Sequence, residues 1–148
     1  MVTVGTSVEA VCSSFWCYVD EGPRPVPDVI CFIPSDETLK FIERLKACFN
    51  VIAGKELVFK EPVVIDEADV EGSVSSVVKV ISRFKEEGFH VVVDVTPGRK
   101  TMSIAAYQAA IKGCADEIVY FHLKDPTFER KFYPLIPRKV RRLVFLKR

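Results

Sequence analysis

Residues 90–115, HVVVDVTPGRKTMSIAAYQAAIKGCA, constrain the fold more than any other stretch of the chain. The apolar run at residues 91–93 is typical of a buried strand, and a turn with one proline and one glycine follows it. From residue 101 to residue 115 the small apolar residues predict a helix. A strand, a tight turn and a helix in this order predict one unit of an α/β fold with a parallel sheet.

The turn in this stretch carries the parts of a phosphate-binding site. Gly98 allows a close approach of the backbone, and Arg99 and Lys100 place two cations at the start of the helix. Amide groups at a helix N-terminus lack a partner within the helix, and the helix dipole adds positive charge there. Because cations at a helix start are otherwise unfavourable by about 0.3–1 kcal/mol, the pair suggests an anionic partner. The alternatives are a solvated Lys100 and a salt bridge of Arg99 with another part of the chain.

Strand and helix patterns alternate along the rest of the chain. Residues 51–65 are rich in β-formers but ambiguous, since they fit either one bulged strand or a hairpin through Gly54 and Lys55. The other patterns predict strands at residues 1–4, 28–33, 117–123 and 140–146, and helices at residues 8–19, 36–49 and 73–87. The alternation predicts an α/β, Rossmann-like, doubly wound sheet. It is mainly parallel, has helices on both faces and forms a single domain over residues 1–148.

Residues that can serve as N-caps precede two of the predicted helices. Ser7 or Thr6 can cap the helix over residues 8–19, and Asp36 or Ser35 the helix that follows the second strand. Asp94 is expected to organise the amide groups of its turn, with a role as general base as the alternative.

Ligands of doubly wound sheets bind at the carboxyl ends of the strands, where the direction of winding reverses. If the first strand and the strand at residues 91–93 flank that point, residues 5–7 and 96–100 meet at one edge. Two hydroxyls, two glycines and two cations would then surround one cleft. Ser7 has a second interpretation as a plain helix cap, and Thr96 and Gly98 as residues that only shape the turn.

Composition and charge exclude few classes of protein. The formal net charge is +1, which gives no overall attraction to nucleic acid or membrane. The last eleven residues hold six Lys or Arg and no acid, a pattern that favours cations guarding an edge strand over a polyanion site. Five cysteines without a CxxC pair predict reduced, buried thiols in a cytoplasmic protein, and no segment approaches a membrane span. We expect no metal site and no cofactor.

The stretch DVTPGRKTMS at residues 94–103, followed by an alanine-rich helix, resembles the signature of the CARF family, the CRISPR-associated Rossmann-fold domains. That signature is roughly Asp-aliphatic-Thr-(Gly/Pro)-Gly-x-Lys-x-Met on the turn after the fourth strand. The stretch GTS at residues 5–7 resembles the second ligand-side motif of the family, on the turn after the first strand. Arg99 departs from the pattern, because many members carry a small or hydroxyl residue there.

The resemblance implies a homodimer that binds cyclic oligoadenylate, with the cyclic tetra-adenylate ring expected, across its two-fold axis in type III CRISPR antiviral signalling. Some stand-alone members are ring nucleases, which cleave the ring without a metal by attack of a 2′-hydroxyl on the adjacent phosphate. Neither a membrane nor a long nucleic acid is expected as a partner. The implied ligand-binding residues are Gly5, Thr6, Ser7, Thr96, Pro97, Gly98, Arg99, Lys100 and Thr101, of which Lys100 and Ser7 are the candidate catalytic residues.

Two other functions stay open from the sequence. One is a non-catalytic sensor of cyclic oligoadenylate that acts through a partner protein. The other is an unrelated α/β domain that binds a mononucleotide or another phosphorylated metabolite.

Overall fold

The computed structural model describes residues 1–148 and contains a five-stranded sheet. Its strands are β1 (Val2–Val4), β3 (Phe32–Pro34), β5 (Val92–Asp94), β6 (Glu117–Leu123) and β7 (Arg141–Lys147). The spatial order is β3-β1-β5-β6-β7, and only β7 runs antiparallel to its neighbour. Two short strands, β2 (Val29–Ile30) and β4 (Val58–Phe59), form a separate parallel pair. The sheet is mainly parallel, as the sequence predicts.

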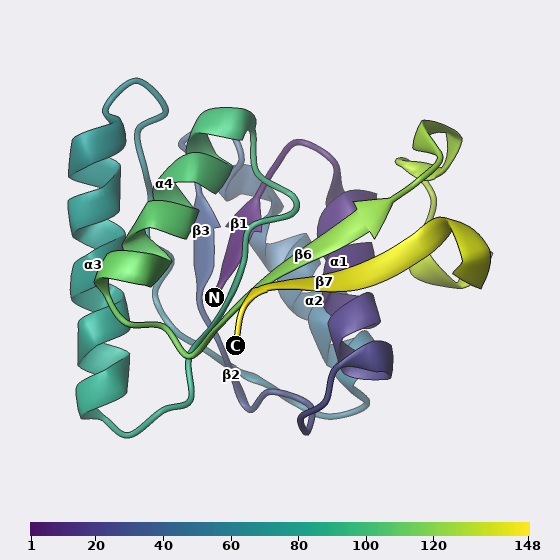
Figure 1. Cartoon of the computed structure of the whole chain (residues 1–148), viewed down its shortest axis with the longest axis horizontal. Coiled ribbons are helices and arrows are strands. Elements are labelled where there is room, and N and C mark those ends of the chain that lie inside the picture. The colour runs from purple at the N-terminus through teal and green to yellow at the C-terminus, as the bar shows by residue number, and fades with distance from the viewer.

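Four helices cover the two faces of the sheet (Figure 1). They are α1 (Val8–Glu21), α2 (Ile42–Ala53), α3 (Val70–Glu86) and α4 (Lys100–Lys112). One core cluster joins α1 and α2 to the sheet, and another joins α3 and α4 to its opposite face. Single 3₁₀ turns lie at Leu39–Phe41, Pro126–Phe128, Tyr133–Leu135 and Arg138–Val140. None of the helices is both long and apolar enough to cross a membrane.

The winding direction reverses between β1 and β5. From β1 the chain passes through α1 to β3 on one side, and it returns through α2, β4 and α3 to β5 on the other side of β1. The backbones of β1 and β5 pair where Val2 lies opposite Asp94. The predicted doubly wound topology is therefore confirmed, and the turns that follow β1 and β5 leave the sheet side by side.

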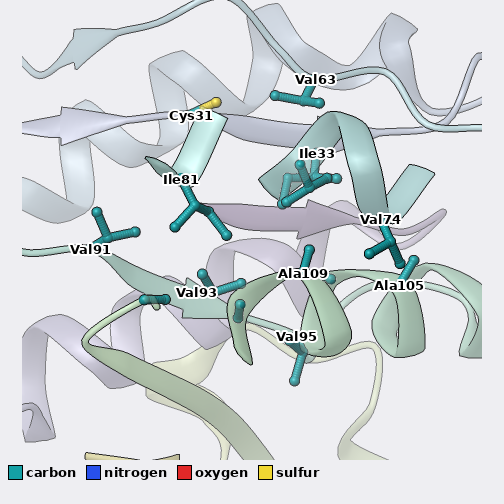
Figure 2. Close-up of a cluster of buried hydrophobic side chains, with 14 of the residues drawn as sticks. Cys31, Ile33, Val63, Val74, Ile81, Val91, Val93, Val95, Ala105 and Ala109 are labelled. Atoms are coloured by element: carbon teal, nitrogen blue, oxygen red, sulfur yellow. The ribbon is translucent and has the colours of Figure 1, made fainter. Parts of the chain in front are cut away.

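Small residues let α4 pack closely on the sheet. Ala105, Ala106, Ala109 and Ala110 are all buried in the cluster that also holds Ile81 of α3. In Figure 2, Ala109 lies near Val93 and Val95, and Ala105 lies beside Val74 of α3. On the other face Phe49 of α2 stacks on Phe15 of α1, with ring centroids 4.0 Å apart. Interdigitated packing of this kind fixes the N-termini of α1 and α4 relative to the strands.

Three local predictions are wrong. Residues 51–53 are the last turn of α2 and not a strand, because Ile52 and Ala53 pack on the core and Gly54 ends the helix with φ = 64°. The third helix begins at Val70 instead of residue 73, since Asp69 accepts a hydrogen bond from the amide of Gly72 at 2.9 Å. Neither Ser35 nor Asp36 caps α2, because a 3₁₀ turn at Leu39–Phe41 intervenes and Phe41 occupies the N-cap position. The hydroxyl of Thr38 instead accepts a hydrogen bond from the amide of Ser35.

The ends of the other elements differ less from the prediction. The helix after the central turn stops at Lys112, three residues early, where Gly113 packs against Ile81. All five cysteines are free thiols, but only Cys12, Cys17 and Cys31 are buried. Cys48 is half-buried and Cys114 is exposed, which corrects the expectation that all of them lie in the core.

Candidate ligand-binding edge

The turns after β1 and β5 touch each other at the carboxyl edge of the sheet, which is the upper edge in Figure 1. A Cβ atom placed on Gly5 would lie 1.7 Å from the carbonyl oxygen of Pro97. Any side chain at position 5 would therefore overlap with the backbone of the second turn. The predicted meeting of residues 5–7 with residues 96–100 at one edge is confirmed.

Asp94 holds the second turn from beneath. Its side chain is buried, and one carboxylate oxygen accepts hydrogen bonds from the amide of Thr96 at 2.9 Å and from the Thr96 hydroxyl at 2.5 Å. The other oxygen accepts a hydrogen bond from the hydroxyl of Ser14 on α1. Burial raises the pKa of Asp94 above its usual range, although these hydrogen bonds act in the opposite direction. Asp94 organises the turn amide as expected.

Sequence reasoning missed Ser14. It lies on a buried face of α1, where a hydroxyl needs a partner, and that partner is the carboxylate of Asp94. The signal in the sequence was a polar pair, Ser13 and Ser14, among apolar residues of a helix. Ser14 connects α1 directly to the turn after β5.

Thr96 uses its hydroxyl within the protein. The hydroxyl donates its single proton to Asp94 and accepts a hydrogen bond from the amide of Phe121 on β6 at 2.7 Å. Thr96 therefore fixes the turn to the neighbouring strand.

The two cations of the turn differ in their partners. The guanidinium of Arg99 pairs with Glu67 at 3.1 Å and also with Glu37. Glu67 and Glu37 raise the pKa of Arg99 above its ordinary value, with the larger effect from Glu67. Lys100 is exposed and forms no ion pair. The salt-bridge alternative for Arg99 is thus the observed one, and Lys100 is the uncommitted charge of the pair.

Ser7 is the N-cap of α1. Its hydroxyl oxygen accepts a hydrogen bond from the amide of Ala10 at 3.2 Å, and the hydroxyl donates to the carboxylate of Glu9 at 3.1 Å. The first turn of α1 therefore carries an acidic side chain, whereas that of α4 carries none. Thr6 is exposed beside this cap.

Donors without acceptors gather at the start of α4. The amide groups of residues 98–101 make no hydrogen bond within the protein, and no side chain caps the helix. Orphan amides and the helix dipole point outward at the place where Lys100 is free. His122 is exposed near the carboxyl end of β6, the strand next to β5. No cluster of His, Cys, Asp or Glu side chains could hold a metal ion. The arrangement suits a phosphate group.

A model of one protein family matches residues 43–146, about seven-tenths of the chain. That family is described as CRISPR-associated protein NE0113. The matched region contains the turn after β5 but not residues 5–7. Among curated proteins no match is found.

A solved structure with a similar fold is Can2 from Sulfobacillus thermosulfidooxidans in complex with cyclic tetra-adenylate. The superposition has a TM-score of 0.54 at 13% sequence identity and covers 86% of this chain. The chain spans only 32% of the length of that protein. At this identity the likeness shows a shared fold.

The contact between the two turns predicts the effect of Gly5→Ala. The added methyl group overlaps with the carbonyl of Pro97, so the turn at residues 96–100 must move. We expect the free energy of unfolding to fall by about 1–3 kcal/mol, measured by urea denaturation, with amide NMR shifts at residues 96–101. Gly54→Ala is the control, because nothing lies within 4 Å of its Cβ and only the positive φ opposes it. Unchanged resonances at residues 96–101 in Gly5→Ala would contradict the contact.

The raised pKa of Asp94 predicts a pH dependence of stability. In the folded protein the carboxyl group binds its proton more tightly than in the unfolded chain. Its contribution is complete below the unfolded pKa, near 3.8, and is lost as the pH rises through the folded pKa. The difference in unfolding free energy between wild type and Asp94→Asn should therefore shift in favour of the variant as the pH rises from about 4. Denaturation at several pH values measures this difference, and a shift toward the wild type would contradict the assignment.

Proposed function

Because the chain belongs to the family of CRISPR-associated protein NE0113, we propose that it binds a cyclic oligoadenylate at the edge where the two turns meet. Cyclic tetra-adenylate is the ring we expect, since the structural neighbour was solved with that molecule. The role that follows is in type III CRISPR antiviral signalling. The observation that carries the proposal is the contact of Gly5 with Pro97, which brings two helix N-termini to one surface.

Phosphate recognition rests on the start of α4. Each phosphodiester of the ring carries one negative charge, and the free amides of residues 98–101 with the unpaired Lys100 offer donors and charge in the same place. Gly98 is crowded beneath by Thr3 and Met102, so its open side faces away from the core. Thr101 and Thr6, both exposed, are the side chains available for further polar contacts.

Charge at this edge is limited in a single copy. Arg99 is paired with Glu37 and Glu67, and Glu9 accepts a hydrogen bond from the hydroxyl of Ser7. One uncommitted lysine is weak recognition for a ring of several phosphates. A symmetric pair of edges would bring two copies of Lys100 to one ligand and would match a ring with internal two-fold symmetry.

An uncovered apolar surface supports a homodimer. Ile104, Tyr107 and Ile111 follow the helical spacing on α4, and 52%, 39% and 46% of their surfaces are exposed. On β6, Tyr120 lies on the same side of the sheet as Ile118, which packs with the alanines of α4, yet Tyr120 is exposed. We propose that a second copy of the chain covers this surface beside the ligand-binding edge.

Beyond binding, we propose that the protein cleaves the ring slowly and without a metal. A 2′-hydroxyl must be held in line with the leaving oxygen while charge builds on the phosphorane oxygens. Lys100 and the amides of residues 98–101 would stabilise that charge, and Ser7 would orient the reacting group after releasing Glu9. Neither His90 nor His122 forms a hydrogen bond with either turn, so efficient acid–base catalysis is not expected and the rate should be low.

Incubation of the protein with cyclic tetra- and hexa-adenylate, followed by chromatography, tests both ring binding and ring cleavage. Linear products identify a ring nuclease, and Ser7→Ala should then reduce cleavage more than binding. Retention of an intact ring on the protein identifies a sensor. A protein that binds neither ring would instead fit a site for a mononucleotide or another phosphorylated metabolite, and the proposal would fail.

Binding should depend on Lys100. Lys100→Ala removes a charge-assisted contact, so affinity for cyclic tetra-adenylate should fall by about 1.5–3 kcal/mol per site, measured by calorimetry. Stability should hardly change, because the side chain is exposed and unpaired. Lys112→Ala is the matched control, since it removes the same charge from the last turn of the same helix. Equal losses in the two variants would mean that only net charge matters.

The proposed dimer depends on the stripe along α4. Tyr107→Glu places a charge in that surface and should give a monomer in light scattering, with weaker ring binding. Val58→Glu, on an exposed apolar residue of β4, should leave the dimer intact. A wild-type protein that is monomeric both with and without the ring would exclude this interface.

A further inference from the structure

A cavity with a mainly apolar lining lies at the edge of the sheet opposite to the two turns. It measures about 350 Å³ and reaches the amino ends of β1 and β5. Phe15 lines it from the α1 side, and Phe84 and Phe89 line it from the α3 side. Residues 25–27 of the proline-rich loop after α1 complete its wall. The proposed function makes no use of this chamber.

A polar hollow adjoins the chamber, because Arg24 and His90 line both. Glu117, the first residue of β6, lines this hollow and is only 5% exposed. Its Oε1 atom accepts a hydrogen bond from Nε of Arg24 at 2.7 Å and lies 3.3 Å from Nε2 of His90.

The second carboxylate oxygen of Glu117, Oε2, is buried and has no hydrogen-bond partner. A buried carboxylate oxygen without a donor is unfavourable, so its position calls for a donor from outside the chain. The neighbouring carboxylate of Asp116 already has donors for both oxygens, because it accepts hydrogen bonds from Nζ of Lys85 at 2.6 Å and from the amide of Val91.

We propose that the chamber and the hollow together bind a small amphipathic amine. The apolar body of the ligand occupies the chamber, and its ammonium group enters the hollow, where a rotation of the Glu117 carboxylate exposes Oε2 and lets it accept a hydrogen bond. The volume falls at the lower end of small-molecule sites, and a cavity of about 150 Å³ already holds benzene. An acid is disfavoured, since the missing partner is a donor and since Arg24 already pairs with Glu117.

The test compares 3-phenylpropylamine with 3-phenylpropionate, which have the same apolar body and opposite charge. Each is titrated into the full chain and followed by two-dimensional NMR. The amine should bind saturably, with shifts at Val26, Phe89 and Glu117, while the acid should bind at least about tenfold more weakly. Glu117→Gln should weaken the amine about tenfold and leave the acid no weaker.

Val26→Trp provides a second variant that does not alter Glu117. The larger side chain fills the chamber from the loop and should abolish binding of the amine, so the proposal remains testable even if Glu117→Gln does not fold. Equal affinity for the two probes, shifts confined to other regions, no binding of the amine, or unchanged binding in Val26→Trp would each overturn the proposal. Because the chamber lies away from the two turns, a failure of ring binding would leave this result unaffected.

Discussion

The carboxylate of Asp94 lies at the carboxyl end of β5 and receives hydrogen bonds from Thr96 and from Ser14 of α1. The same Thr96 hydroxyl accepts a hydrogen bond from the amide of Phe121 on β6, so a short network joins α1, the turn after β5 and β6. Burial opposes the charge of Asp94 and raises its pKa, while the hydrogen bonds hold it in place. The turn after β5 owes its shape to this network, and Gly5 allows the turn after β1 to pack against it.

Arg99 supports the same turn from the outer side. It reaches Glu37, in the segment after β3, and Glu67, in the segment before α3, so its charge links two connections that are distant in sequence. In the structure the guanidinium of Arg99 is therefore paired with two carboxylates, whereas Lys100 has no such partner. In the proposed site, phosphate recognition then rests on the free backbone amides at the start of α4 and on Lys100.

Much of this arrangement could be predicted from the sequence. Alternating strand and helix patterns determined the fold class, and the strand–turn–helix at residues 90–115 identified the edge because its glycine, proline and paired cations are local signals. Residues 51–53 misled the prediction, since β-branched residues were packed as a helix by tertiary contacts. The partners of Arg99 and Ser14 could not be predicted, because they come from segments brought close only by the topology.

The two edges of the sheet differ in character, with exposed donors at the carboxyl ends and an apolar chamber at the amino ends. A crystal structure of the protein with cyclic tetra-adenylate tests the central claim most directly. The account predicts a phosphate within hydrogen-bond distance of the amides of residues 98–101 and of Nζ of Lys100, in each of two symmetry-related copies. A ring bound elsewhere, or one whose phosphates contact neither turn, would contradict it.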